Sequence, residues 1–522
     1  MMIQWLKRNQ NSLSLLALTL LVILLRLPFV EQPFDNDSAA NAYHARLILR
    51  GEPLYGSHHP IHHLPGVYYV YALILRLLGD STASLKIGLM LWQVVTMWLL
   101  YYLAKFLHGQ RLAILAALFY SFLSADIYLL GMTAETELFV NLPRIASIFA
   151  LLYLRHKQAP AWQFSLVGFL GVICFWFKAI YLSTFILAIL IEFEARPFSL
   201  TKTTQRLIWV GVGALAGAVP VVAYFATQGL LTDLGQVFTF GQRYVSTNTC
   251  ITTTDLFSPI WLFYPAIGFT NYNIVLFVLS LCGGFMLIKR RNHPDLVLLK
   301  YIAYWYLLAY AEALPARMYR PYYFQLIIPP LALVAAWFLL DLYQLFRQLL
   351  PKRAVYGALG GLTLWAIGIT TYHNFNYYAH YAAYRLGQET FATFITDGFA
   401  QPNYNLLELA DLAQYIQNHT TPEDYVYYWS GDVQLYYLAD RHAPTKVIWV
   451  CYLGTMESAQ QIFIPQTKYI VIPQKVFAAP RQPATASPSY HALPVWFDEY
   501  LLRDFTLETT LHEQQIYRRI AP

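Results

Sequence analysis

Residues 13–31, LSLLALTLLVILLRLPFVE, form an almost uninterrupted apolar run near the start of the chain. A helix needs about 20 apolar residues to cross the roughly 30 Å hydrocarbon core of a bilayer. The run is long for a cleavable signal, no small-residue cleavage site follows it, and further apolar segments come after it. We therefore predict that this run is the first transmembrane helix.

Ten more apolar segments follow along the chain. They span residues 84–104, 112–130, 138–154, 163–177, 179–193, 207–227, 271–288, 296–313, 323–342 and 354–372. The two segments on either side of Lys178 are short and nearly continuous, so one long interrupted helix is the alternative there. The pattern predicts a mainly α polytopic membrane protein with about eleven transmembrane helices.

Composition supports this class of protein. Hydrophobic residues make up 57% of the chain and charged residues only 12%, whereas soluble domains carry about a quarter charged residues. The net charge of +6 is typical of cytoplasmic anchoring in a membrane protein and does not indicate a nucleic-acid partner.

The distribution of basic residues predicts the orientation. With the N-terminus in the cytoplasm, every loop on that side carries Lys or Arg, as the positive-inside rule requires. The C-terminal region then lies outside the cytoplasm. Compact loops and the lack of a targeting extension favour the plasma (inner) membrane of a prokaryote. A disulfide between Cys250 and Cys451 is one possibility, because the predicted orientation places both cysteines outside the cytoplasm.

Two domains are predicted, a transmembrane domain at 1–375 and a small extracytoplasmic α/β domain at 376–522. The first outside loop, 32–83, contains two expected amphipathic helices at 38–49 and 66–78. In the C-terminal domain we expect a helix with a stripe of apolar residues, three short strands and a flexible loop at 478–490. The stripe is Leu406, Leu407, Ala410, Ala413 and Ile416, and the strands are 425–429, 446–450 and 469–472.

Charged residues that persist in so apolar a chain are functional candidates, since burying an ionised group near lipid is costly. The predicted orientation places one set of them on the outer face: Asp35, Asp37, Glu135, Glu137, Lys178, Arg243, Arg317 and Arg320. A carboxylate can take the proton of an acceptor hydroxyl or amine, and Lys or Arg can hold a phosphate. The set therefore favours group transfer from a phosphate leaving group. Interfacial charges that pair only for structure are the alternative.

The stretch Asp37–Tyr55 resembles the first-loop motif of the GT-C glycosyltransferases, in particular the dolichyl-phosphate-mannose protein mannosyltransferases and the bacterial aminoarabinose transferases. Further similar motifs follow in the same order along nearly the whole chain. They are 62–69, 134–139, Phe177-Lys178, Tyr322–Gln325 with Pro329-Pro330, and the C-terminal segments 424–431 and 436–441.

The resemblance implies a transferase that moves a sugar from a polyprenyl-phosphate donor to a lipid, protein or glycan acceptor, with inversion at the anomeric carbon. It implies Asp37 as the catalytic base, Glu137 as an assisting carboxylate, and Lys178, Arg317 and Arg320 as ligands of the donor phosphate. Glu135, Tyr55, Tyr322 and Tyr323 are expected to position donor or acceptor.

Two departures from the family pattern affect these roles. The family often has Asp-Glu in its first motif, whereas Ser38 follows Asp37 here, so Asp35 could share or take the role of base. His63 stands where the family often has a Lys, and a neutral imidazole binds phosphate more weakly. His58, His59, His62 and His63 could also bind a divalent metal. The favoured interpretation is a solvated loop in which one or two of these histidines contact the donor, and the residues indicate no other cofactor. A transporter or lipid flippase, or a non-catalytic member of the same fold, is the alternative function.

Overall fold

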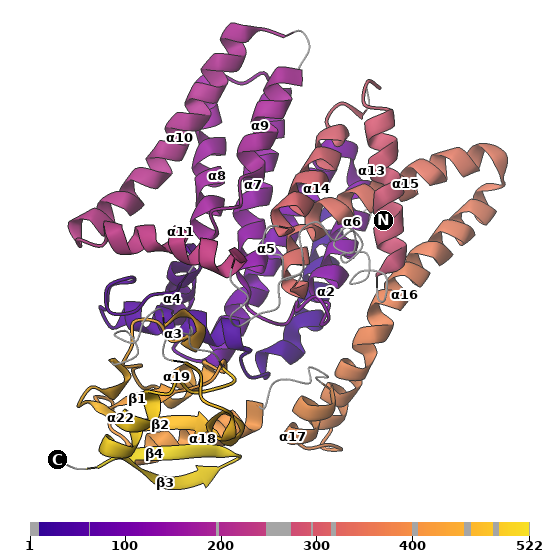
Figure 1. The fold of residues 1–522 in the computed structure, drawn as a ribbon. Coiled ribbons are helices and arrows are strands. Elements are labelled where there is room, and N and C mark those ends of the chain that lie inside the picture. The colour runs from indigo at the N-terminus through magenta and orange to yellow at the C-terminus, as the bar shows by residue number, and fades with distance from the viewer. Residues whose placement is uncertain are drawn as a thin grey trace. The chain divides into compact units, whose positions relative to one another are not determined.

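The computed structural model describes residues 10–61, 63–194, 198–246, 273–293, 296–314, 320–398, 406–453, 461–483 and 490–520. The chain divides into two compact units (Figure 1). The first unit comprises Met1–Gln32, Ala83–Val222 and Thr254–Ala400, and the second comprises Pro33–Thr82, Ala223–Thr253 and Gln401–Pro522. Each unit is described in turn. The predicted domain boundary at 375 falls inside a long helix, α16 (Lys352–Arg385).

The first unit is a helical bundle. Its helices are α2 (Gln10–Arg26), α5 (Thr82–His108), α6 (Gln110–Ser124), α7 (Thr136–His156), α8 (Ser165–Phe177), α9 (Ser183–Glu194), α10 (Leu200–Thr227), α13 (Ile274–Lys289), α14 (Leu299–Ala313), α15 (Ile328–Leu349) and α16. Short elements are η1 (Leu27–Val30), η2 (Ala161–Phe164), η4 (Pro321–Leu326), α17 (Phe391–Thr393) and the π-helix η5 (Phe394–Gly398). The predicted mainly helical membrane fold is confirmed, because the described part of each predicted apolar segment lies largely on one of these helices.

Six helices among the described residues are long and apolar enough to cross a membrane. They lie at Asn11–Val30, Thr82–His108, Thr136–His156, Leu200–Thr227, Ile328–Leu349 and Lys352–Arg385. The apolar helices Gln110–Ser124, Ala161–Phe177 and Ile274–Lys289 are shorter. The predicted total of about eleven spans therefore stays a prediction.

The two short helices around Lys178 are separate elements. Helices α8 and α9 contact each other and both pack on α7 (Figure 1), so the alternative of one long interrupted helix is wrong. Helix α8 also approaches α10 closely, since a Cβ atom on Gly168 or Gly213 would collide with the opposing backbone. Small residues at helix crossings permit such close packing in membranes.

The second unit combines the first predicted outside loop with the C-terminal region. Its helices are α3 (Asn36–Leu49), α4 (Gly66–Leu78), α11 (Leu231–Ser246), α18 (Leu406–His419), α19 (Gln434–Ala439), α21 (Gln474–Ala478) and α22 (Phe497–Asp504), with the 3-10 turns η6 (Val450–Tyr452) and η7 (Gln461–Phe463). Helices α3 and α4 confirm the two helices expected in the loop. The expected surface amphipathic character of α3 is wrong, because every side chain from Ser38 to Leu47 is buried. Its polar side chains instead meet partners within this unit.

The C-terminal region carries a four-stranded sheet with the order β1-β2-β4-β3. Its strands are β1 (Tyr425–Tyr428), β2 (Thr467–Pro473), β3 (Phe505–Leu511) and β4 (Gln514–Arg519). Strands β1 and β2 are parallel, and the other two pairs are antiparallel. His512 and Glu513 join β3 to β4 with positive φ angles of 47° and 59°, as a tight hairpin turn with right-handed twist requires.

Side chains on one face of the sheet pack into an apolar cluster of buried residues. Tyr427, Ile470, Ile472 and Tyr517 belong to it, together with Phe497 of α22. On the opposite face Tyr469 lies against Tyr415 of α18, with ring centroids 6.5 Å apart. The predicted small α/β arrangement is therefore confirmed.

Several details of that region differ from the prediction. Residues 446–450 form no strand, and the last of them, Val450, begins η6. Strands β3 and β4 were not predicted. In α18 the buried apolar residues include Leu409 and Leu412 instead of Leu407 and Ala410. The expected flexible loop at 478–490 lies partly outside the described residues, but its described start is anchored by Arg481, which pairs with Asp498 at 2.7 Å.

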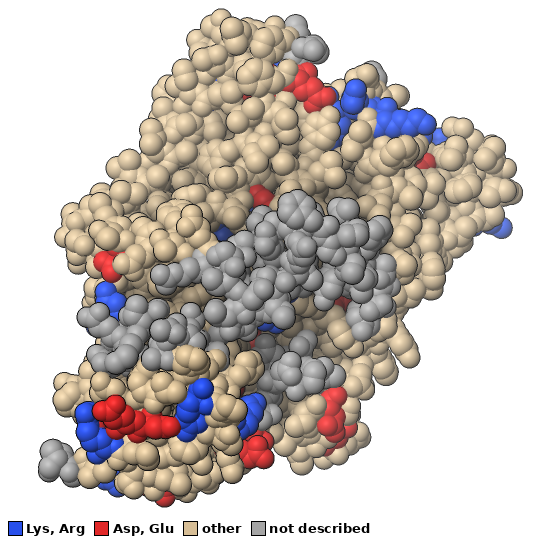
Figure 2. Space-filling view, viewed as in Figure 1, with Lys and Arg blue, Asp and Glu red and all other residues tan. Residues whose placement is uncertain are grey.

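The two units differ in their charged residues and in the state of their cysteines. On the face drawn in Figure 2, Lys, Arg, Asp and Glu are sparse over the helices of the bundle and gather over the C-terminal sheet. Cys451 is disulfide-bonded, whereas Cys174 and Cys282 are free thiols. The other cysteine of the predicted pair, Cys250, lies outside the described residues.

Candidate active site

A buried ion pair between Glu137 and Lys178 lies in the first unit. Glu137 stands in the first turn of α7 and is fully buried, and its Oε1 accepts hydrogen bonds from Lys178 Nζ at 2.5 Å and from the Tyr181 hydroxyl at 2.8 Å. Its Oε2 has no hydrogen-bond partner among the described residues. Burial without full pairing is costly for a carboxylate, so this position indicates a function beyond packing.

Two tyrosines lie beside the Lys178 ammonium group. Lys178 Nζ is 4.9 Å from the ring centroid of Tyr323 and 5.9 Å from that of Tyr322. Aromatic faces attract a cation electrostatically. Both tyrosines belong to η4, which begins directly after the exposed Arg320. The structure thus brings together Glu137, Lys178, Tyr322 and Tyr323, four residues predicted from the sequence.

Hydrogen bonds fix η4 against its neighbours. Asn141 of α7 donates to the Gln325 carbonyl at 3.0 Å, and Gln325 Nε2 donates to the Leu129 carbonyl at 2.9 Å. These contacts hold η4 against α7 and the segment before it, although the bonded residues are nearly two hundred positions apart in the chain. The buried amides hold the tyrosines near Lys178.

The segment between α6 and α7, which leads to Glu135 and Glu137, is anchored by buried cations. Arg26 donates to the carbonyls of Gly131 and Ser124 at 2.7 and 2.6 Å, and Lys86 donates to the Met132 carbonyl at 2.7 Å. Charge-assisted bonds of this kind are stronger than neutral ones. They give the acidic motif a rigid support, and Glu135 is buried at the N-cap of α7.

In the second unit the two aspartates of the first-loop motif have different environments. Asp35 is the N-cap of α3, since its carboxylate accepts from the Ser38 backbone N–H at 2.9 Å and from the Ser38 hydroxyl at 2.5 Å. Asp37 is half-buried in the first turn of the same helix. Burial, with the charge of Asp37 as the next cause, raises the pKa of the Tyr68 hydroxyl well above 10. The negative charge of Asp37 therefore interacts electrostatically with the Tyr68 hydroxyl.

The histidines of the first loop lie mostly in the interior of this unit. His44 Nδ1 and His58 Nδ1 are 2.8 Å apart, and the two rings are stacked. His59 Nε2 lies 3.0 Å from the Asp233 carbonyl. Burial lowers the pKa of His58 to about 4 and lowers that of His44 well below 6.5. These rings are accordingly neutral near pH 7.

Other predicted site residues have these positions. Tyr55 is fully buried with a φ of 69°, and its hydroxyl donates to the His63 carbonyl at 2.9 Å, so it braces the loop. Arg317 and His62 lie outside the described residues, as does the side chain of Arg243. No group of three or more His, Cys, Asp or Glu within the described part of the chain is arranged to hold a metal ion.

Sequence reasoning missed several polar residues next to the site. Tyr181 shares the Glu137 carboxylate with Lys178, and Asn36 separates the two aspartates. A second buried ion pair, Arg144 with Glu312, lies within the bundle, where Ser183 joins both side chains. The signal for the last pair was present, because charged residues inside predicted spans are rare.

The chain is similar to known proteins in part of its sequence and in its fold. A family model described as dolichyl-phosphate-mannose-protein mannosyltransferase matches residues 58–224. No curated protein is similar enough in sequence to match. The crystal structure of ArnT from Cupriavidus metallidurans bound to undecaprenyl phosphate superposes with a TM-score of 0.63 at 12% identity, and the match covers 98% of each chain.

The chain has the GT-C fold. A second structure with this fold, the Archaeoglobus fulgidus oligosaccharyltransferase tethered to an acceptor peptide, has a TM-score of 0.53 at 13% identity over 91% of this chain and 70% of its own. Arabinofuranosyltransferase AftD from Mycobacteria has a TM-score of 0.50 at 13% identity over 99% of this chain and 40% of its own. The GT-C resemblance seen in the first-loop motif is therefore confirmed at the level of the fold.

Proposed function

We propose that this chain is an integral membrane glycosyltransferase that takes a sugar from a polyprenyl-phosphate donor and gives it to a lipid, protein or glycan acceptor. The buried Glu137–Lys178 pair carries the proposal. Burying two charges in an apolar helical bundle can cost more free energy than their pairing returns, so the presence of this pair points to a role beyond stability. The fold is shared over almost the whole chain with ArnT, whose structure holds undecaprenyl phosphate.

In the proposed reaction the carboxylate of Asp37 takes the proton from an acceptor hydroxyl or amine. The acceptor atom forms a bond to the anomeric carbon while the bond from that carbon to the phosphate oxygen breaks. The electron pair of the broken bond stays on the polyprenyl phosphate, whose charge changes from about −1 to −2. Attack from the side opposite the phosphate inverts the anomeric centre.

The charge that develops on the leaving phosphate needs cationic support. We assign this role to Lys178, with Arg320, Arg317 and His63 as further phosphate ligands. Glu137 holds the ammonium group of Lys178, and the two neighbouring tyrosines limit its rotation. Glu135, Tyr322, Tyr323 and Tyr55 would position the donor or acceptor.

Asp37 is the better candidate for the base, and Asp35 the weaker one. The N-cap bonds occupy both carboxylate oxygens of Asp35, which lowers their availability to a substrate. Asp37 is half-buried in the first turn of α3, two residues after the N-cap. The proposal includes an orientation with the N-terminus in the cytoplasm and the C-terminal domain outside it, in a plasma (inner) membrane.

The test uses the purified protein in vesicles with undecaprenyl-phosphate-linked mannose, glucose and aminoarabinose as separate donors. Membrane extract supplies acceptors, and release of undecaprenyl phosphate is measured. We expect at least one donor to be consumed, with Asp37→Asn slowing release about 100-fold or more. Asp35→Asn is the matched control, since Asn also caps a helix.

Equal rates for Asp37→Asn and Asp35→Asn would overturn the role of Asp37. Binding of undecaprenyl phosphate itself, followed by native mass spectrometry, tests the donor class independently. We expect Lys178→Ala to weaken that binding about tenfold or more. A wild-type protein that neither binds this lipid nor releases it from any donor would refute the glycosyltransferase and favour the transporter.

A further inference from the structure

Helix α3, which carries Asp37, is held along its length by residues 430–443 of the C-terminal region, here called the clamp segment. The contact begins at Asn36, between the two aspartates. Its Oδ1 accepts from the Val433 backbone N–H at 2.9 Å, and its Nδ2 donates to the Gly431 carbonyl. One amide side chain thus makes two opposed bonds to a single backbone turn, which fixes its position and its direction.

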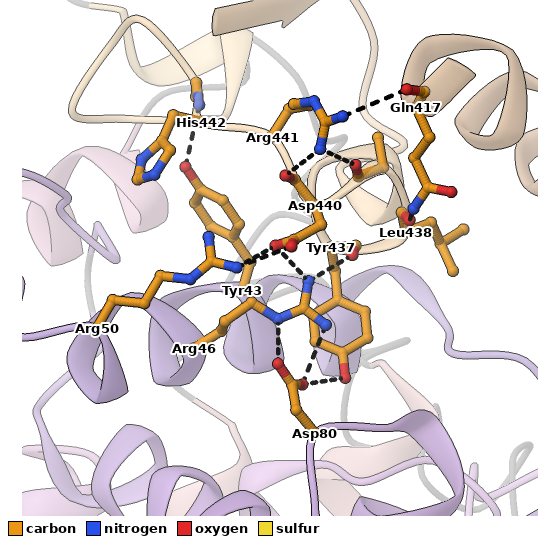
Figure 3. Close-up of polar contacts among 12 residues, drawn as sticks. Tyr43, Arg46, Arg50, Asp80, Gln417, Tyr437, Leu438, Asp440, Arg441 and His442 are labelled. Atoms are coloured by element: carbon orange, nitrogen blue, oxygen red, sulfur yellow. Dashed lines mark hydrogen bonds and ion pairs between the residues drawn. The ribbon is translucent and has the colours of Figure 1, made fainter. Parts of the chain in front are cut away.

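The far end of α3 is held by charge (Figure 3). Arg46 pairs with Asp80 at 2.7 Å and with Asp440 at 3.0 Å, donates to the Tyr437 carbonyl at 2.7 Å, and stacks 3.8 Å from the centroid of the Tyr437 ring. Arg50 binds both oxygens of Asp440, at 2.6 and 2.8 Å. Such planar, multidentate contacts restrain orientation more tightly than a single ion pair does.

The middle of the helix is also held. The Tyr43 hydroxyl accepts from the Ala443 backbone N–H at 3.1 Å, and the rings of Tyr43 and Tyr436 are 5.7 Å apart. Contacts at the start, middle and end of a three- to four-turn helix leave little freedom for it to tilt or slide. The burial of Ser38–Leu47 agrees with this restraint.

The clamp segment is itself well fixed. Arg441, which follows Asp440, donates to the carbonyls of Gln417 and Thr420 at the end of α18, at 3.4 and 2.9 Å (Figure 3). Asp440 has a left-handed backbone with φ 52°. A residue other than glycine adopts this conformation rarely, and Asp is among those that tolerate it. The turn is therefore shaped to present the Asp440 carboxylate to both arginines.

We propose that the clamp segment positions Asp37: Asn36 sets the start of α3 and the Arg46–Arg50–Asp440 cluster sets its direction. The inference rests on the proposed role of Asp37 as base. The C-terminal domain would then act in catalysis through α3, and Asn36 and Asp440 would be positioning residues. A displacement of about 1 Å in a reacting group can slow a reaction about 100-fold.

Three variants test this proposal in the donor-release assay. Asn36→Ala removes both backbone bonds, and Asp440→Ala removes the partner of both arginines. Asp498→Ala is the matched control, because it breaks another two-bond Arg–Asp pair of the same unit, with Arg481, that does not touch α3. We expect kcat to fall about 10- to 100-fold for the first two variants, with the donor KM changed less than about twofold, and no such fall for the control.

A second comparison separates positioning from a general loss of structure. When Asn36→Ala is added to Asp37→Asn, the residual rate should stay the same, because a base that is absent cannot be misplaced. Hydrogen exchange at residues 36–49 should become faster in Asp440→Ala and stay unchanged in Asp498→Ala. This measurement applies even where a variant has lost its activity.

Two results would overturn the inference. One is a wild-type kcat for Asn36→Ala and Asp440→Ala. The other is that Asn36→Ala lowers the rate by the same factor in the wild type and in Asp37→Asn. Failure of the proposed function looks different, because the wild type would then release undecaprenyl phosphate from no donor. Failure of the role of Asp37 as base would leave Asp37→Asn as active as the wild type. An inactive Asp37→Asn beside fully active Asn36→Ala and Asp440→Ala would refute the positioning role alone.

Discussion

Lys178 Nζ lies 2.5 Å from Glu137 Oε1, with two tyrosine rings within 6 Å of the ammonium group. The side chain of Glu137 is fully buried and that of Lys178 is 11% exposed. Neither charge can be hydrated well by bulk water. Each charge therefore depends on its partner and on the neighbouring tyrosines for stabilisation.

Removal of one member of this pair should be more harmful to folding than removal of both charges. Lys178→Ala leaves a buried carboxylate without its cation, and we expect a loss of about 3–5 kcal/mol in stability. The double variant Glu137→Gln with Lys178→Met should recover most of the thermal stability but no sugar transfer. Thermal unfolding in detergent, measured beside the donor-release assay, checks both statements. Recovery of activity in the double variant would contradict the assigned role of Lys178.

Asp35 should prove to be a residue of structure. Asp35→Ala removes the N-cap of α3 and is expected to cost about 1 kcal/mol, whereas Asp35→Asn should cost far less because Asn is an equally good cap. Thermal unfolding of the two variants gives this difference. A stable Asp35→Asn protein with turnover as low as that of Asp37→Asn would move the base to Asp35.

The second unit should lose stability in mild acid. The pKa of His58 is lowered from 6.5 to about 4, chiefly by burial and further by His442 and His59, against a raising bond to the Glu52 carbonyl. A histidine with a depressed folded-state pKa contributes stability above pH 6.5, and that stability is lost as pH falls towards 4. The loss for His58 alone is about 3 kcal/mol.

Hydrogen exchange of α3 as a function of pH measures this effect. We expect the protection factors, which correct for the pH dependence of intrinsic amide exchange, to fall between about pH 6.5 and 4, and His58→Gln to flatten the profile. His512→Gln, at a histidine on the β3–β4 turn, is the control and should leave the profile unchanged. A fall in protection that persists in full in His58→Gln would show that another group causes it.

The disulfide at Cys451 gives a prediction about topology. Disulfides persist in oxidising compartments, so the C-terminal domain should lie outside the cytoplasm. In intact cells a membrane-impermeant maleimide should label Cys451 only after reduction of the protein. Peptide mass spectrometry reads the label directly. Labelling of Cys451 without a reductant would contradict the bond, and a lack of labelling even after reduction would contradict the proposed orientation.

Much of the helical framework follows from hydropathy alone. Runs such as 84–104 and 207–227 must shield their backbone polar groups in a bilayer, and a helix is the structure that does so within one segment. Helix α5 extends beyond 84–104 at both ends, and α10 begins before residue 207. Polar flanking residues continue each helix past the segment that hydropathy identifies.

The short strands and the surface of α3 were harder to predict. Strands β3 and β4 carry many polar side chains. Strand β4 pairs with β2, more than thirty residues earlier in the chain, and β3 pairs with β4. The loop helix Asn36–Leu49 contains Asn41, His44 and Arg46, which looks like a solvated face. It is buried because α4, His58 and the clamp segment pack against it, and local periodicity cannot reveal these tertiary partners.

Residue chemistry and order along the chain were sufficient to select Asp37, Glu137 and Lys178 as site candidates, since few charged groups stand in this apolar sequence. Only the tertiary structure paired Lys178 with Glu137, made Asp35 a helix cap and joined Asn36 to the turn at Gly431. Pairing and capping depend on distances of about 3 Å between groups that are far apart in the chain. Such distances arise from packing, whereas the cost of placing a charge in lipid is already set by the side chain itself.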